Sequence, residues 1–281
     1  MVEIMNFMPT GASKTGAQRA SGQLQLSFQR SLGTTRIDRF YQEGCLKARL
    51  PRRVDPAICD AVLMNLSGGI AGGDRLVTDI VLDAQTQACV SSQAAERIYR
   101  ALDAPASIVT RIALQPGAAL HYLPQETILF DGFALHRSLE IALAQDAVFL
   151  GVEALVFGRQ AMGEVLRAGH LRDQISLWRD GRRVLQDMTR LDGEIAAQLD
   201  RPAVAGGARA MAALILAGPG AEQKLAPLRA ALAGARAGVS VVAQTLFVRI
   251  LAPDGASLRN CVQTALDICR DGRALPKLWQ G

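Results

Sequence analysis

The chain lacks most of the features that mark enzymes in a sequence. It has three histidines, His121, His136 and His170, too widely spaced to form a metal-hydrolase motif. There is no G-x-S-x-G sequence, and Ser67, which adjoins a glycine pair, has no histidine near it in the sequence. We therefore expect a protein without enzyme activity, in which each histidine stands alone and is structural.

Cysteines and aromatic residues are also scarce. The five cysteines are an odd number, include no C-x-x-C pair and do not form a disulfide framework, which fits a reducing compartment. Aromatic residues make up 5% of the chain, and none is interleaved with the arginine clusters at 49–53 and 179–183. Despite a net charge of +5, this pattern favours solvated surface over nucleic-acid binding.

Long apolar runs are missing as well. The most apolar run, Ala210 to Ala217, is of strand length, so we expect no membrane span. Residues 1–22 lack a basic segment followed by an apolar one, and their Gly, Ser, Thr and Ala content predicts a flexible N-terminal leader. Cytoplasmic location follows as the expectation.

What the sequence does contain is many short apolar or alternating runs, which predict a β-rich body over residues 23–204. Turn signals such as Gln115-Pro116-Gly117, Asp131-Gly132 and Asp180-Gly181 separate them at short intervals. The predicted strands include 24–28, 108–114, 119–123, 135–143, 148–157, 171–177 and 184–191. The fold class predicted here is mainly β.

Residues 205–281 change character and predict a strand, helix, strand, helix portion packed on the body as part of one structural domain. Strands are expected at 211–216 and 239–251. A helix is expected over 222–237, with Pro227 tolerated near its start. A second helix is expected over 258–270, ending before Gly272 as a C-terminal cap.

The most informative segment is Asn65 to Leu76, in which two glycine pairs precede a carboxylate. The spacing of Gly68 and Gly73 resembles a phosphate loop, but Asp74 and Arg75 follow where such a loop needs Lys and a hydroxyl. The flanking residues predict strands, whereas a phosphate loop leads into a helix. The segment is therefore interpreted as a strand, glycine turn, strand unit that presents Asp74. Gly68, Gly69, Gly72 and Gly73 shape the turn.

Other acids lie within or beside apolar segments. Glu153 is inside Gly151-Val152-Glu153-Ala154-Leu155, and Asp187 follows Val184-Leu185. Burying a lone charge is costly, so the residues alone favour an outward orientation or pairing with an arginine such as Arg159 or Arg190. Glu96, before Arg97, and Asp74 complete a set of acids whose shared use would be a wet, negatively lined passage.

Four further segments, in order, are similar to signatures of the urease accessory protein family UreD, also called UreH. They are Ser91 to Arg100 (SSQAAERIYR), Tyr122 to Gly132 (YLPQETILFDG), Gly158 to Glu164 (GRQAMGE) and Leu275 to Trp279 (LPKLW). The resemblance runs from about Leu24 to Trp279. Leu66 and Ser67 stand where the family usually has prolines, and Tyr122 where it often has Trp.

The resemblance implies an elongated, β-helix-like stack of many short strands with two α-helices. It also implies a maturation factor that binds UreF, and through it UreG, and docks on apo-urease. Nickel would pass through an internal tunnel, with no cofactor permanently bound and Ni²⁺ only in transit. By position in the matching segments, Asp74 and Glu153 are candidates for lining the tunnel, with Asp187 and Glu96 as further candidates. Carboxylates hold nickel more weakly than imidazole or thiolate does, which suits transit.

Two other classes of function stay open. One is a metal-dependent hydrolase that uses Asp74 with a distant histidine, and the other is a β-rich binding scaffold unrelated to nickel. Turnover assays with divalent metals would identify the first. Neighbouring urease structural genes would favour the maturation role over both, and their absence would weaken it.

Overall fold

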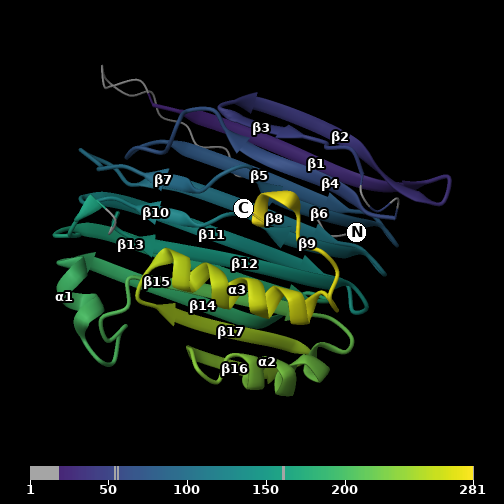
Figure 1. Ribbon diagram of the computed structural model, residues 1–281. Coiled ribbons are helices and arrows are strands. Elements are labelled where there is room, and N and C mark those ends of the chain that lie inside the picture. The colour runs from purple at the N-terminus through teal and green to yellow at the C-terminus, as the bar shows by residue number, and fades with distance from the viewer. Residues whose placement is uncertain (1–18, 54, 56, 160–161, 281) are drawn as a thin grey trace.

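The computed structural model describes residues 19–53, 55, 57–159 and 162–280. The leader predicted over 1–22 therefore lies largely outside the described residues. Strands dominate the described part, and the chain passes back and forth between two stacked sheets as a solenoid-like stack of about four turns (Figure 1). The mainly β, β-helix-like architecture expected from the sequence is confirmed.

One sheet, called sheet A, has seven strands in the order β14-β13-β11-β8-β5-β1-β2. The five central strands are mutually parallel, and β2 and β14 pair antiparallel at the two edges. The bounds are β1 Ser21–Ser31, β2 Thr34–Gly44, β5 Arg75–Leu82, β8 Ala106–Leu114, β11 Phe133–Leu143, β13 Gly169–Arg179 and β14 Arg182–Gly193.

The other sheet, sheet B, has ten strands, eight of them in the order β16-β17-β15-β12-β9-β6-β4-β3, with β7 and β10 branching from β12. Strands β4, β6, β9 and β12 are parallel rungs. The bounds are β3 Leu46–Arg49, β4 Cys59–Asn65, β6 Gln87–Ser92, β7 Glu96–Ile98, β9 Ala119–Leu123, β10 Thr127–Leu129, β12 Val148–Phe157, β15 Ala210–Ala217, β16 Arg236–Val242 and β17 Thr245–Ala252.

Strand β11 shows why these residues form a two-faced sheet. Every second residue of β11, including Leu135, Leu139 and Ile141, is buried, and the residues that alternate with them are partly exposed, as the two-residue period of a strand requires. The inward side chains of sheet A meet those of sheet B in one hydrophobic core. The expected strand alternation is confirmed along this segment.

Helices cover the other face of sheet B. The long helix α3, Gly255–Cys269, crosses in front of β15 and β17, and α2, Leu225–Ala231, lies beside β16 (Figure 1). Asp254 caps α3 by accepting from Ser257 N at 2.7 Å, and Gly272, with φ +70°, follows its last turn. The remaining helical elements are α1 Ile195–Asp200 and the 3₁₀ turns η2 Ala221–Lys224 and η3 Lys277–Trp279.

The C-terminal portion corrects the predicted element bounds. The helix expected over 222–237 is one 3₁₀ turn followed by α2, which ends at Ala231, and strand β16 begins five residues later. The single strand expected over 239–251 is the end of β16 and most of β17, joined by a tight turn at Ala243 and Gln244, both with positive φ. The short α1 was not expected. No helix of the described residues is long and apolar enough to span a bilayer.

Candidate functional site

A cavity of about 280 Å³ lies between the two sheets. Its walls come from both of them: Thr78, Thr110 and Arg137 from sheet A, and Tyr122 and Glu153 from sheet B, among others. At one end the lining residues are exposed and belong to the β4–β5 glycine segment, the β6–β7 loop and β7. These are Gly68, Gln93, Ala94 and Arg97. The cavity thus reaches from the surface to a buried, charged floor.

Arg137 is the centre of that floor. It occupies a position of β11 in phase with Leu135 and Leu139, so its side chain enters the space between the sheets and is 7% exposed. Its Nε and Nη2 donate to the two carboxylate oxygens of Asp173, each at 2.8 Å. Its Nη1 lies 2.6 Å from Glu153 Oε2 and donates to Thr127 Oγ1 at 3.1 Å. One guanidinium therefore joins strands of both sheets.

The charges of this cluster do not balance, because two carboxylates share one cation. Burial raises the pKa of Glu153 to about 7, Arg137 opposes that rise, and the negative charge of Asp173 adds to it. For Arg137, burial disfavours the cation, but Asp173 and Glu153 outweigh it and raise its pKa. Glu153 is thus the acid of this cluster that binds a proton near neutrality.

Glu96 lies nearer the exposed end of the same cavity. Both of its carboxylate oxygens accept from Asn65 Nδ2, at 3.2 and 3.1 Å, and Arg97 N donates to Oε1 at 3.2 Å. Burial raises its pKa, while the bond from Asn65 works in the opposite direction. Of the four acids selected from the sequence, the structure brings Glu96 and Glu153 together in one cavity.

Asp74 is buried but lies outside the cavity lining. One carboxylate oxygen accepts from Ala20 N and the other from Ala71 N, both at 2.8 Å. The acid thus ties the glycine segment to the residue that precedes β1. Its present contacts are structural, and its part in a metal passage stays a prediction.

Asp187 lies on the edge strand β14 and pairs with Arg249 of β17, so it links the two sheets away from the cavity lining. For Asp187, too, a passage role stays a prediction. Its partner is not Arg190, which the sequence offered as an alternative. Likewise, the arginine that pairs with Glu153 is Arg137 and not Arg159, which pairs with Glu164.

The four glycines do two different things. Gly68, Gly69 and Gly73 have positive φ, as a glycine turn requires. Gly72 is needed for close approach, because a Cβ there would lie 2.5 Å from Ala101 Cβ and 2.6 Å from Ala104 O. A side chain at Gly72 would therefore push against backbone that cannot move freely.

The expectation that each histidine stands alone is wrong for two of the three. His136 Nε2 lies 3.0 Å from His170 Nε2 on the outer face of sheet A. His121 is partly buried near the end of α3, where its Nδ1 accepts from Arg270 Nη1 at 2.5 Å, and desolvation lowers its pKa to about 3. Sequence spacing could not show the pair, since 34 residues separate its members and parallel pairing of β11 with β13 brings them together.

Sequence reasoning also missed Arg137 and Asp173. A signal for Arg137 was present, because the strand 135–143 alternates and Arg137 falls on its apolar phase. No equivalent signal marked Asp173 as its partner, since that depends on the register of β11 with β13. Among the described residues, no group of three or more His, Cys, Asp or Glu side chains is placed to hold a metal ion.

These features define a class: a β-helix-like protein with a polar, charged cavity between its sheets and no assembled metal site in its described part. The chain is similar to the family model described as "UreD urease accessory protein", which matches residues 20–280. It is 42% identical over 271 residues to the urease accessory protein UreD of Chelativorans sp. (strain BNC1), covering 95% of this chain and 96% of the relative.

Two further relatives carry the same description. The protein of Rhizobium etli is 42% identical over 268 residues, covering 95% of this chain and 98% of the relative. That of Methylobacterium sp. (strain 4-46) is 44% identical over 255 residues, covering 88% and 90%. The chain belongs to the UreD urease accessory protein family, and that family supports a role in urease maturation.

Proposed function

We propose that the chain is a non-catalytic maturation factor of the cytoplasm. It binds UreF, and through it UreG, docks on apo-urease, and lets Ni²⁺ pass through the cavity between its sheets. The observation that carries this proposal is the pair of acids, Glu96 and Glu153, placed along one cavity that reaches the surface. Nickel is cargo here, and no cofactor is permanently bound.

The dimensions and chemistry of the cavity support passage. Six water molecules, the usual number around a divalent cation, occupy about 180 Å³ in the liquid. A hydrated cation therefore fits within the cavity volume of about 280 Å³. Carboxylates, hydroxyls and water bind nickel more weakly than imidazole or thiolate, and transit requires weak sites that the ion can leave. No histidine or cysteine is among the described residues that line the cavity.

Glu153 and Arg137 together would control the inner end of the passage. A divalent ion that reaches Glu153 displaces its proton and gains the carboxylate as a ligand. Arg137 repels the ion, but its two bonds to Asp173 hold the guanidinium in place while Glu153 turns to the ion. The ion is thereby attracted but not retained.

The test is coexpression of urease and its other accessory proteins with wild-type chain, without it, or with a Glu96→Gln/Glu153→Gln double variant, at limiting nickel. Urease nickel content should fall severalfold for the double variant and further without the chain, while capture of UreF by the variant is unchanged. Glu140→Gln, which alters a 45% exposed acid of β11 outside the cavity lining, should behave as wild type.

The coexpression experiment distinguishes the maturation role of the chain from the passage of nickel through its cavity. Full nickel loading of urease in the absence of the chain would reject the maturation role. Full loading by the double variant would reject passage past Glu96 and Glu153, while leaving the scaffold role intact. Turnover of ester or phosphate substrates by purified protein with divalent metals would instead support the hydrolase alternative.

A further inference from the structure

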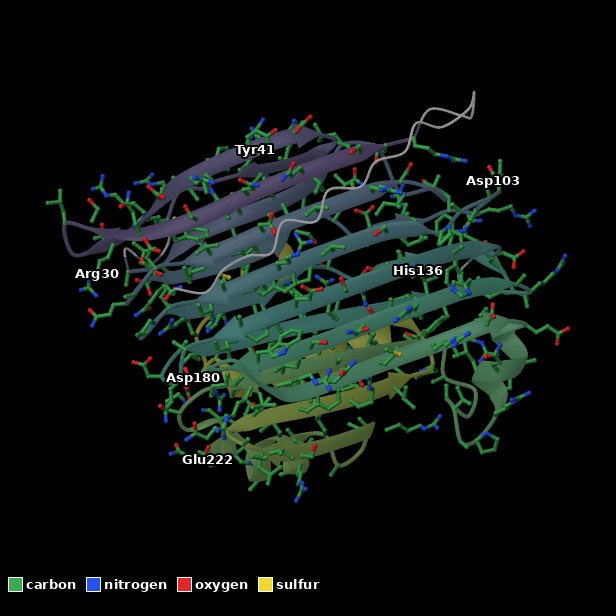
Figure 2. The ribbon with its side chains drawn as sticks, turned by 180° about the vertical axis from the view of Figure 1, so that it is seen from behind. Arg30, Tyr41, Asp103, His136, Asp180 and Glu222 are labelled. Carbon is green, nitrogen blue, oxygen red and sulfur yellow. The ribbon has the colours of Figure 1, made fainter. Side chains whose placement is uncertain are left out.

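The outer face of sheet A carries a histidine pair that the cavity does not use. His136 of β11 and His170 of β13 have their Nε2 atoms 3.0 Å apart, and both rings are partly exposed. His136 lies on the face of the sheet turned to the viewer in Figure 2. Its neighbour in sequence, Arg137, enters the cavity on the opposite face, so the pair is separate from the passage.

Asp192 orients one member of the pair. Its Oδ1 lies 3.1 Å from His170 Nδ1, across the antiparallel pairing of β13 with β14. In the neutral ring Nδ1–H donates to this carboxylate, which leaves a lone pair on Nε2 directed at His136. A carboxylate that fixes a histidine in this way also makes its free nitrogen a better metal ligand.

The spacing of the two nitrogens suits a metal ion. With metal–nitrogen bonds of about 2.1 Å, two ligands at 90° are about 3.0 Å apart, whereas a tetrahedral angle places them about 3.4 Å apart. Ni²⁺ and Cu²⁺ favour square-planar or tetragonal centres, which have ligands at 90°. We propose that His136 and His170 form a surface binding site for Ni²⁺ or Cu²⁺, with water as the remaining ligands.

Two features of the surroundings oppose metal binding: the position of a proton on His136 and the positive charge of a neighbouring arginine. Without metal, His136 Nε2–H donates to His170 Nε2, so binding requires His136 to carry its proton on Nδ1 instead. Arg172, opposite His136 in the register of the two strands, adds a positive charge. Asp192, which pairs with His170, offsets that charge.

Most other imidazole and thiol groups of the described residues are poorer ligands than the pair. His121 Nδ1 accepts from Arg270 Nη1, and burial raises the pKa values of Cys45, Cys59, Cys89 and Cys269. Binding by imidazole therefore differs from binding by thiolate in its absorption spectrum and, for Cu²⁺, in nitrogen coupling by electron paramagnetic resonance. The inference goes beyond the proposed function, since loss of this site leaves the cavity acids untouched.

The test is titration of the full-length protein with NiCl₂, CuCl₂ and MgCl₂ by calorimetry. We expect one equivalent of Ni²⁺ or Cu²⁺ to bind with nitrogen ligands, and no binding of Mg²⁺, which prefers oxygen. His136→Gln and His170→Gln should each abolish this event. Asp192→Asn should weaken it by about tenfold or more without changing the metal-free melting temperature. Asp180→Asn, an exposed acid at the other end of the β13–β14 hairpin, should bind as wild type.

Unchanged Ni²⁺ affinity in the His136→Gln variant would overturn the proposal, as would thiolate absorption on binding or no binding by the wild-type protein. If His170→Gln melts at a lower temperature, His136→Gln decides the matter, because His136 has no carboxylate partner among the described contacts. Asp192→Asn binding as tightly as wild type would overturn the orienting role of that carboxylate.

Discussion

Glu153 makes the stability of the protein depend on pH. Burial raises its pKa from 4.5 to about 7, so between these values the folded protein binds more protons than the unfolded chain. Stability therefore falls as pH rises through that window. Replacing Glu153 by Gln removes the titrating group, and we expect the variant to lose less stability than wild type from pH 4.5 to 8, by up to about 3 kcal/mol.

Urea unfolding at several pH values measures this difference directly. Glu140→Gln is the matched control, because Glu140 lies on the same strand as Arg137 but is 45% exposed beside Arg111. That control should follow the wild-type pH dependence. Parallel pH curves for wild type and Glu153→Gln would show that Glu153 is ionised throughout and that Arg137 dominates its titration.

Asp74 should matter for folding, whatever its part in metal passage. Its side chain is 4% exposed and accepts two backbone N–H bonds, from Ala20 and Ala71. Removing the carboxylate leaves both donors without this partner, so Asp74→Ala should lower the free energy of unfolding by about 2–4 kcal/mol. Chemical denaturation checks this value, with Asp79→Ala on β5, the strand that follows Asp74, as control.

The control is informative because Asp79 pairs with the half-exposed Arg111, and such surface pairs contribute about 0–1 kcal/mol. Equal losses for the two variants would contradict a structural role for Asp74. The expected loss also affects how activation assays are read. In an activation assay, alanine at Asp74 would lower stability as well as remove the acid, so carboxamide variants of Glu96 and Glu153 are the ones that test passage.

The residues of the site were predictable to different degrees. Glu153 and Glu96 could be selected because each is an acid in or beside an apolar or signature segment. For Arg137 the only sequence signal was its position among the buried residues of an alternating strand. For Asp173 there was no signal in the neighbouring sequence. What decides the cluster is the register of β11 with β13, which is fixed by packing of both sheets and not by neighbouring residues.

Among the elements, the C-terminal 3₁₀ turn η3 is anchored to β9 and α3 through Trp279. Trp279 is 2% exposed, its Nε1 donates to Leu123 O of β9 at 2.9 Å, and Arg259 of α3 lies 5.1 Å above its ring. Trp279→Ala should therefore cost about 3–5 kcal/mol of stability. Trp279→Phe keeps the ring but leaves the buried Leu123 carbonyl without its donor, and should cost about 1–3 kcal/mol.

Urea unfolding followed by circular dichroism measures these losses without relying on the altered tryptophan. Lys277→Ala, an exposed change in the same turn, should stay within about 0.5 kcal/mol of wild type. Wild-type stability in Trp279→Ala would mean that η3 is not anchored through its tryptophan, against the contacts with β9 and α3.

Element bounds followed from the sequence where a strong local rule applied. Strands β9 and β12 have the bounds read from their apolar runs, and α3 ends at its predicted glycine cap. The β16–β17 turn was missed because Ala243 and Gln244 adopt positive φ without the glycine or asparagine that usually marks such a turn. Helix α2 was overextended because alanine-rich sequence after Ala231 favours a helix, whereas pairing with β17 draws the chain into β16.

For the whole molecule, sequence patterns predicted many short strands but not how they stack. No repeat of fixed length was visible, and the β-helix-like arrangement came from family resemblance. The structure shows why periodicity was hidden. Successive rungs differ in length, and in chain order the short strands β7 and β10 of sheet B come after β6 and β9 and before β8 and β11 of sheet A. The polar cavity between the sheets is a property of that stack, so no single segment could reveal it.

The arrangement of layers predicts that the body and the C-terminal portion unfold together. Strands β12 and β15 bury side chains on both faces of sheet B. Phe149 and Ile215 pack in the core between the sheets. Leu150 and Leu214 pack on the opposite face, against the helices. Separating the two portions would expose both faces of sheet B at once. Calorimetry should therefore give one transition whose calorimetric and van't Hoff enthalpies agree. Two resolved transitions, with Trp279→Ala lowering only one, would show that the helical layer is an independent unit.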